Sequence, residues 1–330
     1  MVLALAAVMA SAGCGGSGTA PTVAGSCKSI QRVSPVAVTA APDGLQLPTG
    51  SGAVGLTLAP DGAVWFLATG NNRVYRITPA FRAEYWQLPA SELGFQLSIA
   101  QDGTAWIPEQ YRDAIASISP SGAMSECHLA GGAQPTMALA LPDGTVWVAE
   151  NGGNGLARLS QGRFKQMTLP PPNRGVTEMA PDGAGGVWAT ESKADALVHA
   201  NSSGLLTEVS LNHDGATPLG ILAARDGSIW VAEFAGSRID HVGPGDKRTS
   251  FPLADGSAPQ GLAEAADGSL WFTESKADRI GMITPKGEIA LKLDRPAGAW
   301  PDHIAIAPDG ALWWTEYYAE RVVRLPAPTT

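Results

Sequence analysis

The stretch "ADGSLWFTESKADRIGMITPKGE", residues 266–288, contains two turns separated by short strands. Its Asp-Gly pair, flanked by alternating apolar residues, favours a tight hairpin turn, and Thr-Pro-Lys-Gly favours a second turn. Variants of this stretch recur along the whole chain, so their spacing decides the fold.

Tryptophan marks the period of the repeat. Seven tryptophans follow each other at intervals of 41 or 42 residues, each preceded by an Asp-Gly pair: Trp65, Trp106, Trp147, Trp188, Trp230, Trp271 and Trp313. The Asp lies four residues before its Trp in six units, and Asp182 lies six before. Each unit reads as four short strands, which predicts an all-β, seven-bladed β-propeller with four-stranded blades. We number the blades 1–7 by these tryptophans and expect each Trp in the core between neighbouring blades.

The last unit stops after "RVVRLPAPTT" and lacks an outer strand. Upstream of the first unit, "DGLQLPTG" (residues 43–50) resembles the outer strands of other units, such as "EYWQLPAS". We therefore expect the N-terminal segment to supply the outer strand of blade 7, which leaves no open edge between the ends of the chain. The propeller is predicted to span residues 37–330.

The composition limits the partners. A net charge of -9 and a pI near 5.0 argue against nucleic acid and against an anionic membrane surface. We expect a monomer whose partner is a small molecule, peptide or glycan.

Residues 1–13, "MVLALAAVMASAG", have the apolar character of a secretion signal. Cys14 follows as in a bacterial lipobox, which makes it the candidate lipidation site and the only expected link to a membrane, although Ser11 replaces the usual Leu. Ala10-Ser11-Ala12 offers an ordinary signal-peptidase site as the alternative. Both alternatives predict an extracytoplasmic protein, lipid-anchored or secreted, with residues 14–36 as a flexible linker.

Two further cysteines, Cys27 and Cys127, remain. An oxidising compartment permits a disulfide between them, whereas two unpaired buried thiols are the alternative, and their spacing does not decide between the two.

In a propeller, the loops between blades and the turns between the second and third strands share one face, here called the upper face. The Asp-Gly turns lie on the opposite, lower face. A Glu three residues after the Trp is expected near the upper face in six blades: Glu109, Glu150, Glu191, Glu233, Glu274 and Glu316. These carboxylates could hold a cation such as Mg²⁺, with Glu316 and Glu274 as tentative ligands. A repeated architectural contact is the favoured interpretation for most copies, because repeat units share such contacts.

Blade 7 breaks the repeat. It reads "PDHI" (residues 301–304) where blades 5 and 6 read "PLGI" and "PQGL", so His303 replaces a Gly. A two-residue hairpin would place His303 opposite Glu316, and a type I turn with a Gly bulge would place Asp302 there. In both registers Asp302, His303 and Glu316 are expected to meet as candidate catalytic residues, with His303 as a general base. The candidate ligand-binding residues around them are Trp300, Tyr317, Tyr318, Gln260, His213 and Arg295.

The unit "DGSLWFTESKADRIGMITPKGEI" resembles the repeats of the virginiamycin B lyase (streptogramin lyase) family, as do "DGAVWFLATGNNRVYRITPA" and "DGALWWTEYYAERVVRLPA". The resemblance extends from about residue 43 onward and implies a seven-bladed propeller. It also implies a lyase that opens a cyclic depsipeptide without water. In such a lyase a base removes the proton alpha to an ester carbonyl, Mg²⁺ stabilises the enolate, and the carbon–oxygen bond breaks by elimination.

The family's enzymes carry a Pro-His-Gly motif in each of the last two blades, a Glu two residues before the last His, and a Glu in the final Trp-x-x-Glu. This sequence keeps Glu316 and has Gln260, Asp302 and Trp300 at the other positions. We therefore expect a binding or scaffold protein that uses the upper face. The alternatives are a Mg²⁺-dependent lyase with a rearranged site, and a lactonase-type propeller hydrolase with a cation in its channel.

Overall fold

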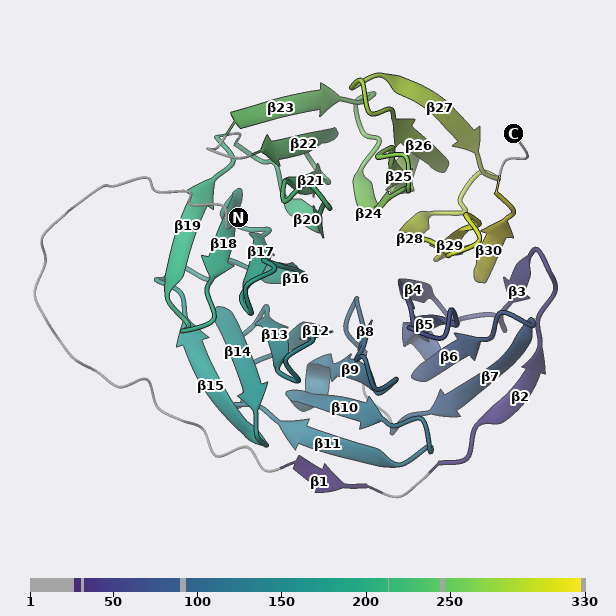
Figure 1. Ribbon diagram of the computed structural model, residues 1–330, viewed down its shortest axis with the longest axis vertical. Helices are drawn as coiled ribbons and strands as arrows, with labels where there is room; N and C mark the ends of the chain where they lie inside the picture. The colour runs from purple at the N-terminus through teal and green to yellow at the C-terminus, as the bar shows by residue number, and fades with distance from the viewer. Residues whose placement is uncertain (1–26, 31–32, 90–92, 213, 244–246, 328–330) are drawn as a thin grey trace, which may run out of the picture.

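The computed structural model describes residues 27–30, 33–89, 93–212, 214–243 and 247–327. Seven antiparallel sheets stand around a common centre (Figure 1), which confirms the seven-bladed propeller. Within each blade the three innermost strands follow one another from the inner side of the ring outward in chain order.

The strands of the first three blades are as follows. Blade 1 contains β4 (Ala53–Leu58), β5 (Val64–Ala68), β6 (Arg73–Ile77) and β7 (Arg82–Gln87). Blade 2 contains β8 (Ser98–Ile99), β9 (Ala105–Glu109), β10 (Ala114–Ile118) and β11 (Met124–His128). Blade 3 contains β12 (Pro135–Ala140), β13 (Val146–Glu150), β14 (Gly155–Ser160) and β15 (Arg163–Thr168).

The later blades repeat this order. Blade 4 contains β16 (Val176–Pro181), β17 (Val187–Glu191), β18 (Ala196–Ala200) and β19 (Leu206–Ser210). Blade 5 contains β20 (Pro218–Ala223), β21 (Ile229–Glu233), β22 (Arg238–Gly243) and β23 (Lys247–Pro252). Blade 6 contains β24 (Pro259–Glu264), β25 (Leu270–Glu274), β26 (Arg279–Ile283) and β27 (Ile289–Asp294). Blade 7 contains β28 (Pro301–Ile306), β29 (Leu312–Glu316) and β30 (Arg321–Leu325). Single 3₁₀ turns, η1 (Thr69–Asn71), η2 (Gln110–Arg112) and η4 (Ser275–Ala277), lie between second and third strands.

The Asp-Gly pairs form one kind of turn. In blade 1 the Asp61 carboxylate accepts the backbone N–H of Ala63 at 3.0 Å, and Gly62 adopts a φ of 79° that a side chain would disfavour. The same bond recurs two residues after the Asp in the other blades, at Asp102, Asp143, Asp182, Asp226, Asp267 and Asp309. The Asp thus fixes the turn and the Gly permits it, which explains why the pair repeats.

The repeated tryptophans pack between blades, as predicted. Trp65 lies in one cluster with Leu97 and Ile107 of blade 2, and Trp313 lies in another with Phe66 of blade 1. Five of the seven are buried, whereas Trp106 and Trp230 are half-buried.

The N-terminal segment closes the ring, and this prediction is also confirmed. Strand β3 (Gly44–Gln46) pairs with β30 as the outer strand of blade 7, with Leu45 opposite Val322. Leu45 is buried. Beyond β3, the Glu320 carboxylate accepts the backbone N–H groups of Gly50 and Ser51 at 2.6 and 2.7 Å, which fastens the entry to blade 1.

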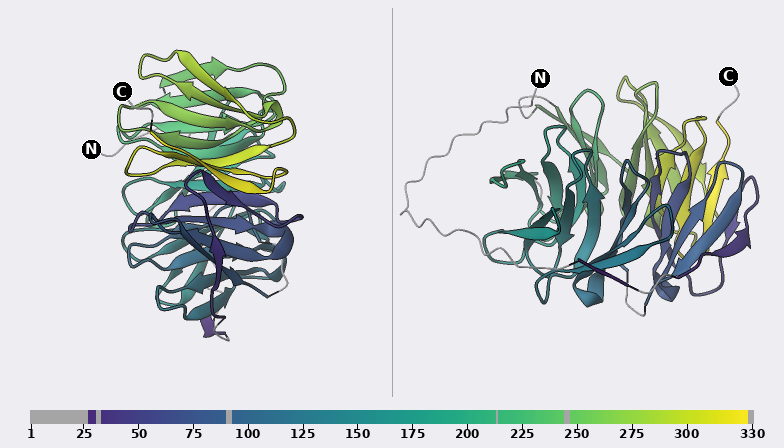
Figure 2. Two further views of the ribbon diagram at one scale, coloured as in Figure 1. Left: turned by 90° about the vertical axis from the view of Figure 1, so that its right-hand side faces the viewer. Right: turned by 60° about the horizontal axis from the view of Figure 1, so that its bottom comes forward.

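Two further strands precede β3 and were not predicted. Strand β1 (Cys27–Ser29) pairs with β11, and β2 (Val36–Thr39) pairs with β7, so blades 2 and 1 have five strands. Figure 2 shows these N-terminal strands, in purple, on the outside of the ring. The prediction of a flexible linker up to residue 36 is therefore wrong for residues 27–29. The free edge of an outer strand has unpaired backbone N–H and C=O groups, and β1 and β2 pair with these groups on β11 and β7.

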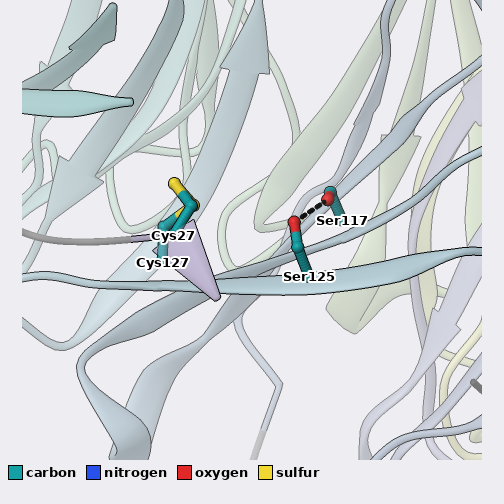
Figure 3. The surroundings of a disulfide bond; sticks show 4 residues. All are labelled: Cys27, Ser117, Ser125 and Cys127. Carbon is teal, nitrogen blue, oxygen red and sulfur yellow. Dashed lines mark hydrogen bonds between the residues drawn. A yellow bond between two sulfur atoms is a disulfide. The ribbon is translucent and has the colours of Figure 1, made fainter. Parts of the chain in front are cut away.

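Cys27 and Cys127 form a disulfide between β1 and β11 (Figure 3), which decides between the two alternatives left by the sequence. Their Cα atoms are 4.1 Å apart, and Cys127 is buried. A hydrogen bond of 2.7 Å between the hydroxyls of Ser117 and Ser125 joins the next two strands of the same sheet.

The predicted signal at residues 1–13 and the candidate lipidation site Cys14 lie outside the described residues. Within the described ranges, no helix has the length and apolar character needed to cross a bilayer.

Candidate functional site

The predicted meeting of Asp302, His303 and Glu316 is correct for two of the three residues. The pairing of β28 with β29 follows the register of a type I turn with a Gly bulge near the turn, with Ile304 opposite Trp314. A bulge then shifts the register, so that Pro301 lies opposite Glu316. Asp302 and His303 therefore share one cluster, and Glu316 belongs to another.

His303 lies at the centre of a buried cluster in the channel of the ring. Its Nδ1 donates to the carboxylate of Asp302, and its Nε2 lies 3.0 Å from Oε1 of Glu178, a residue of blade 4. The amide of Gln260, in blade 6, donates to the other oxygen of Asp302 at 2.8 Å. The backbone N–H of Gly55 also points toward Nδ1 at 3.2 Å, where it could donate to an unprotonated nitrogen. Because an ionised carboxylate is the stronger partner, we assign the Nδ1 proton to Asp302, and the Gly55 contact is then close packing.

The protonation state of His303 follows from these neighbours. Burial alone would lower the pKa of His303, but the charges and hydrogen bonds of Asp302 and Glu178 outweigh burial and raise the pKa to about 10. At neutral pH the side chain is an imidazolium with both ring protons engaged. A general base must accept a proton, so His303 is not poised for the role that the sequence predicted.

The sequence analysis missed Glu178, although a signal for it exists. Ten residues before the repeated Trp, the seven blades carry Gly55, Gln96, Met137, Glu178, Gly220, Gly261 and His303. The acidic and the basic residue of this set lie in blades 4 and 7, across the ring from each other. Glycines elsewhere in the set leave room for neighbouring backbone, since a Cβ on Gly220 would lie 1.8 Å from the carbonyl oxygen of Gln260.

A cavity of about 280 Å³ lies in the channel beside this cluster. Its walls are mostly apolar side chains of the inner strands, and His303, Glu178 and Gln96 are among its polar lining residues. The cluster thus occupies the channel with paired charges.

Glu316 is engaged by two arginines. It is fully buried, Arg295 donates to its Oε1 at 2.7 Å, and Arg321 donates to its Oε2 at 2.5 Å. The indole N–H of Trp314 adds a bond of 2.9 Å. Burial would raise the pKa of Glu316, but the hydrogen bonds from Arg321, Arg295 and Trp314 outweigh it and hold the pKa below its usual value. Arg295, predicted as a ligand-binding residue, is committed to this carboxylate.

Three of the other repeated glutamates, Glu150, Glu233 and Glu274, contact side chains of their own blades. Glu233 and Glu274 lie beside Arg238 and Arg279, the residues opposite them on the third strands, at 2.8 and 3.3 Å. Burial raises the pKa of Glu150 to about 7, although a hydrogen bond from Gln166 opposes this shift. These contacts match the architectural interpretation.

The expected Mg²⁺ ligands do not fit the ion. Glu316 has both oxygens occupied by nitrogen donors, and Glu274 lies in a different blade beside its own arginine. Trp300 stands at the other position where the family resemblance implies a Glu, and an indole offers no oxygen ligand. Among the described residues, no group of three or more His, Cys, Asp or Glu side chains is arranged to hold a metal ion.

Four aromatic side chains gather on the upper face: Phe234, Trp300, Tyr317 and Tyr318, here called the upper aromatic cluster. The ring of Trp300 lies 5.4 Å from that of Tyr318 and 6.4 Å from that of Phe234, and Tyr317 lies 4.9 Å from Tyr318. Tyr318 is 62% exposed. The cluster joins blades 5 and 7, and the sequence analysis missed Phe234 because nothing in the repeat relates it to blade 7.

The loop that carries Trp300 is held by Asp278. The carboxylate of Asp278 accepts the backbone N–H groups of Gly298 and Trp300 at 2.7 and 2.8 Å. Asp113 and Asp195 bind the corresponding loops of blades 3 and 5 in the same way. The backbone of this loop is therefore held by a contact that repeats between blades, whereas the indole of Trp300 is particular to the loop before blade 7. Of the remaining candidates, Gln260 turns into the channel and His213 lies outside the described residues.

Comparison with known proteins agrees with the repeat pattern. Residues 26–154 and 130–329 match the model of the Virginiamycin B lyase family. No curated protein matches the chain.

Solved structures share the fold at low identity. A virginiamycin B lyase from Staphylococcus aureus is 24% identical with a TM-score of 0.79, and the match covers 89% of this chain and 99% of that one. A catalytically inactive histidine-to-alanine variant of that lyase with quinupristin gives 24% identity, a TM-score of 0.80 and the same coverage. A hydrazine synthase from Kuenenia stuttgartiensis is 15% identical with a TM-score of 0.70, covering 86% of this chain and 98% of that one. These likenesses concern the propeller itself.

Proposed function

Because the chain belongs to the virginiamycin B lyase family, we propose that it uses the family's propeller as an extracytoplasmic binding protein for a peptide-like ligand on its upper face. The proposal includes the absence of streptogramin lyase activity. The observation that carries it is the position of His303, whose two ring nitrogens lie within hydrogen-bond distance of the carboxylates of Asp302 and Glu178.

The elimination reaction needs a base and a stabilised enolate. Gln260 and Asp302 occupy the positions where the family resemblance implies histidines, and the two are hydrogen-bonded to each other. Glu316, the one implied residue that is kept, is neutralised by Arg295 and Arg321. Both features support the proposed absence of the base and of the Mg²⁺ ligand that the reaction requires.

Binding is supported by the upper aromatic cluster. The rings of Trp300 and Tyr317 each meet that of Tyr318 edge to face, and the half-buried Trp300 and exposed Tyr318 present large surfaces at little conformational cost. The ammonium group of Lys276 lies 5.1 Å from the ring centre of Phe234 and adds a donor beside the cluster. Aromatic rings with a nearby donor suit a peptide that carries apolar side chains and carbonyl groups.

The proposed location outside the cytoplasm is supported by the disulfide between Cys27 and Cys127, because such bonds persist in oxidising compartments.

The test incubates purified protein with virginiamycin B and Mg²⁺ and follows both binding and chemistry. Elimination leaves the mass unchanged, so a linear product is detected by its chromatographic mobility as well as its mass spectrum. We expect no linear product. By calorimetry we expect saturable binding that Trp300→Ala weakens by about tenfold, the loss of one aromatic contact at the centre of an interface.

Tyr111→Ala is the matched control. Tyr111 is 62% exposed on the turn between the second and third strands of blade 2 and makes no contact with the upper aromatic cluster. A linear product that disappears in Glu316→Ala would establish the alternative, a carbon–oxygen lyase. The absence of both product and binding would contradict the peptide-like ligand.

A further inference from the structure

The lower face carries clefts between neighbouring blades, and one of them differs from the others. It lies between blades 5 and 6, which are side by side in Figure 1, and has a volume of about 570 Å³. The clefts between blades 1 and 2, 4 and 5, and 7 and 1 measure about 320, 400 and 320 Å³. A volume of this size is within the usual range of small-molecule sites, roughly 300–1,000 Å³.

In most of these clefts the polar groups are used internally. The residue opposite the repeated Trp pairs with the Asp of the turn: Arg76 with Asp61 at 2.6 Å, His199 with Asp182 at 2.9 Å, and Arg324 with Asp309 at 2.7 Å. Each pair joins a side chain of the third strand to the Asp-Gly turn, so neither group is left free to bind a ligand.

Blade 5 lacks this pair. Asp226 accepts the N–H and the hydroxyl of Ser228 at 2.9 and 2.6 Å, and His241 forms no hydrogen bond within the described part of the chain. Burial lowers the pKa of His241 and outweighs the opposing charge of Asp226, so the imidazole is neutral at pH 7. It therefore offers one donor and one acceptor to whatever occupies the cleft.

The same cleft has an aromatic wall. Trp230 is half-buried. Its ring centre lies 4.3 Å from that of His241 and 5.5 Å from that of Phe251. Polar side chains surround the three rings in the lining: Asp226, Thr249, Glu264, Thr284 and Lys286. An apolar wall with a few polar groups is typical of ligand sites.

The charges select among ligands that prefer aromatic walls. A quaternary ammonium would be attracted to the rings and to the carboxylates of Asp226 and Glu264, but the cation of Lys286 opposes it, so the lining has no single sign of charge that selects a cation. An anion would meet Asp226 and Glu264. A sugar ring carries no charge, its C–H groups pack on aromatic faces, and its hydroxyls bind carboxylates, hydroxyls and a neutral imidazole.

We infer that the cleft between blades 5 and 6 on the lower face binds a neutral carbohydrate, with Trp230 and Phe251 packing against a sugar ring and His241 bonding its hydroxyls. This site is separate from the upper aromatic cluster, so it stands or falls independently of the function proposed above.

The test measures binding of maltohexaose, cellohexaose and N-acetylchitohexaose by calorimetry. We expect at least one to bind. His241→Ala should weaken that binding by about tenfold, through the lost ring and hydrogen bonds. Lys286→Ala removes the ammonium donor of the cleft lining, so it should weaken the binding of sugar hydroxyls. The side chain is exposed, so the fold should not be affected.

Lys292→Ala is the matched control, because Lys292 is exposed on the outer strand of blade 6 and outside the lining. It should change affinity by less than about twofold, as surface substitutions do. Failure of all three oligosaccharides to bind would overturn the inference, and so would binding that both cleft variants retain. Binding lost only in Trp300→Ala would place the sugar on the upper face and would also overturn it.

Discussion

His303 and Glu178 stand at the same position of the repeat, ten residues before Trp313 and Trp188, and their side chains meet in the channel with 3.0 Å between Nε2 and Oε1. Both are buried, with Asp302 on the other side of the imidazolium. The contact links blade 4 to blade 7 through residues 125 positions apart. A blade otherwise packs against its two neighbours, so this pair adds a connection that the repeat does not provide.

Removing His303 should therefore be costly. His303→Ala leaves two buried carboxylates without a counter-charge, and we expect the free energy of unfolding to fall by about 3–5 kcal/mol. Chemical denaturation measures this change in the free energy of unfolding. His128→Ala is the control, since that side chain is half exposed on β11 and should change stability by no more than about 0.5 kcal/mol. Adding Glu178→Gln to His303→Ala should restore part of the loss. Equal effects of the two histidine substitutions would refute the proposed role of the cluster.

A second buried charge lies in blade 5. Asp240 is fully buried, and neither of its oxygens has a hydrogen-bond partner among the described residues. Ten residues after the repeated Trp, the other blades carry uncharged side chains: Tyr75, Ala116, Ala157, Val198, Gly281 and Val323. Burial together with the charge of Asp240 raises the pKa of the neighbouring Glu233 to about 8.

We expect Asp240→Asn to stabilise the protein by about 1–3 kcal/mol at pH 8, because it removes a buried charge at nearly constant volume. The measurement is urea denaturation at pH 8, with Asp255→Asn, at an exposed position, as the control. A destabilised Asp240→Asn protein would mean that the carboxylate has a favourable partner.

The parts of this molecule that the sequence predicts are those that repeat. The spacing from Trp65 to Trp313 predicts the blades, and the likeness of residues 43–50 to an outer strand predicts the pairing of Leu45 with Val322. Strands β1 and β2 occur once each and are only 3 and 4 residues long, so no period marks them.

The site was harder to predict because its contacts join different blades. His303 stands out against Gly220 and Gly261, but the bulge that separates it and Asp302 from Glu316 depends on three-dimensional packing. The partner of His303 could have been found only by comparing the same repeat position in all seven blades.

The dependence of stability on pH follows from the repeated glutamates. Burial raises the pKa of Glu109, Glu150 and Glu191 to about 7, and that of Glu233 to about 8. Each folded value exceeds the unfolded value near 4.5, so the folded state binds more protons between these limits. This contribution is complete below about pH 4.5 and is lost as the pH rises through 7–8.

We therefore expect the melting temperature to fall between pH 5.5 and 8.5. The carboxylates with lowered pKa, such as Asp61 and Asp309, lose their stabilisation only below this window. The pKa of His303 is raised from 6.5 to about 10, so its stabilisation is lost progressively above about pH 6.5 and adds to the fall. Glu191→Gln should flatten the profile by an amount on the order of 2 kcal/mol, since Glu191 has no hydrogen-bond partner to lose among the described residues. A profile that rises with pH, or one that Glu191→Gln leaves unchanged, would contradict this assignment.

The disulfide between Cys27 and Cys127 should stabilise the protein without being needed for the propeller. It closes a loop across a sequence separation of 100 residues, and loss of such a bond typically costs about 2–4 kcal/mol. Strand β1 is a fifth strand, so the four strands of blade 2 can stay paired without it. We expect Cys27→Ser with Cys127→Ser to lower the free energy of unfolding by that amount while the far-ultraviolet circular dichroism stays unchanged.

Amide hydrogen exchange should rise at Lys28 and along β11, with β15, the uncovered outer strand of blade 3, as the internal reference. Exchange that stays slow along β11 would show that backbone pairing alone holds β1 in place, and loss of the circular dichroism signal would show that blade 2 depends on the bridge.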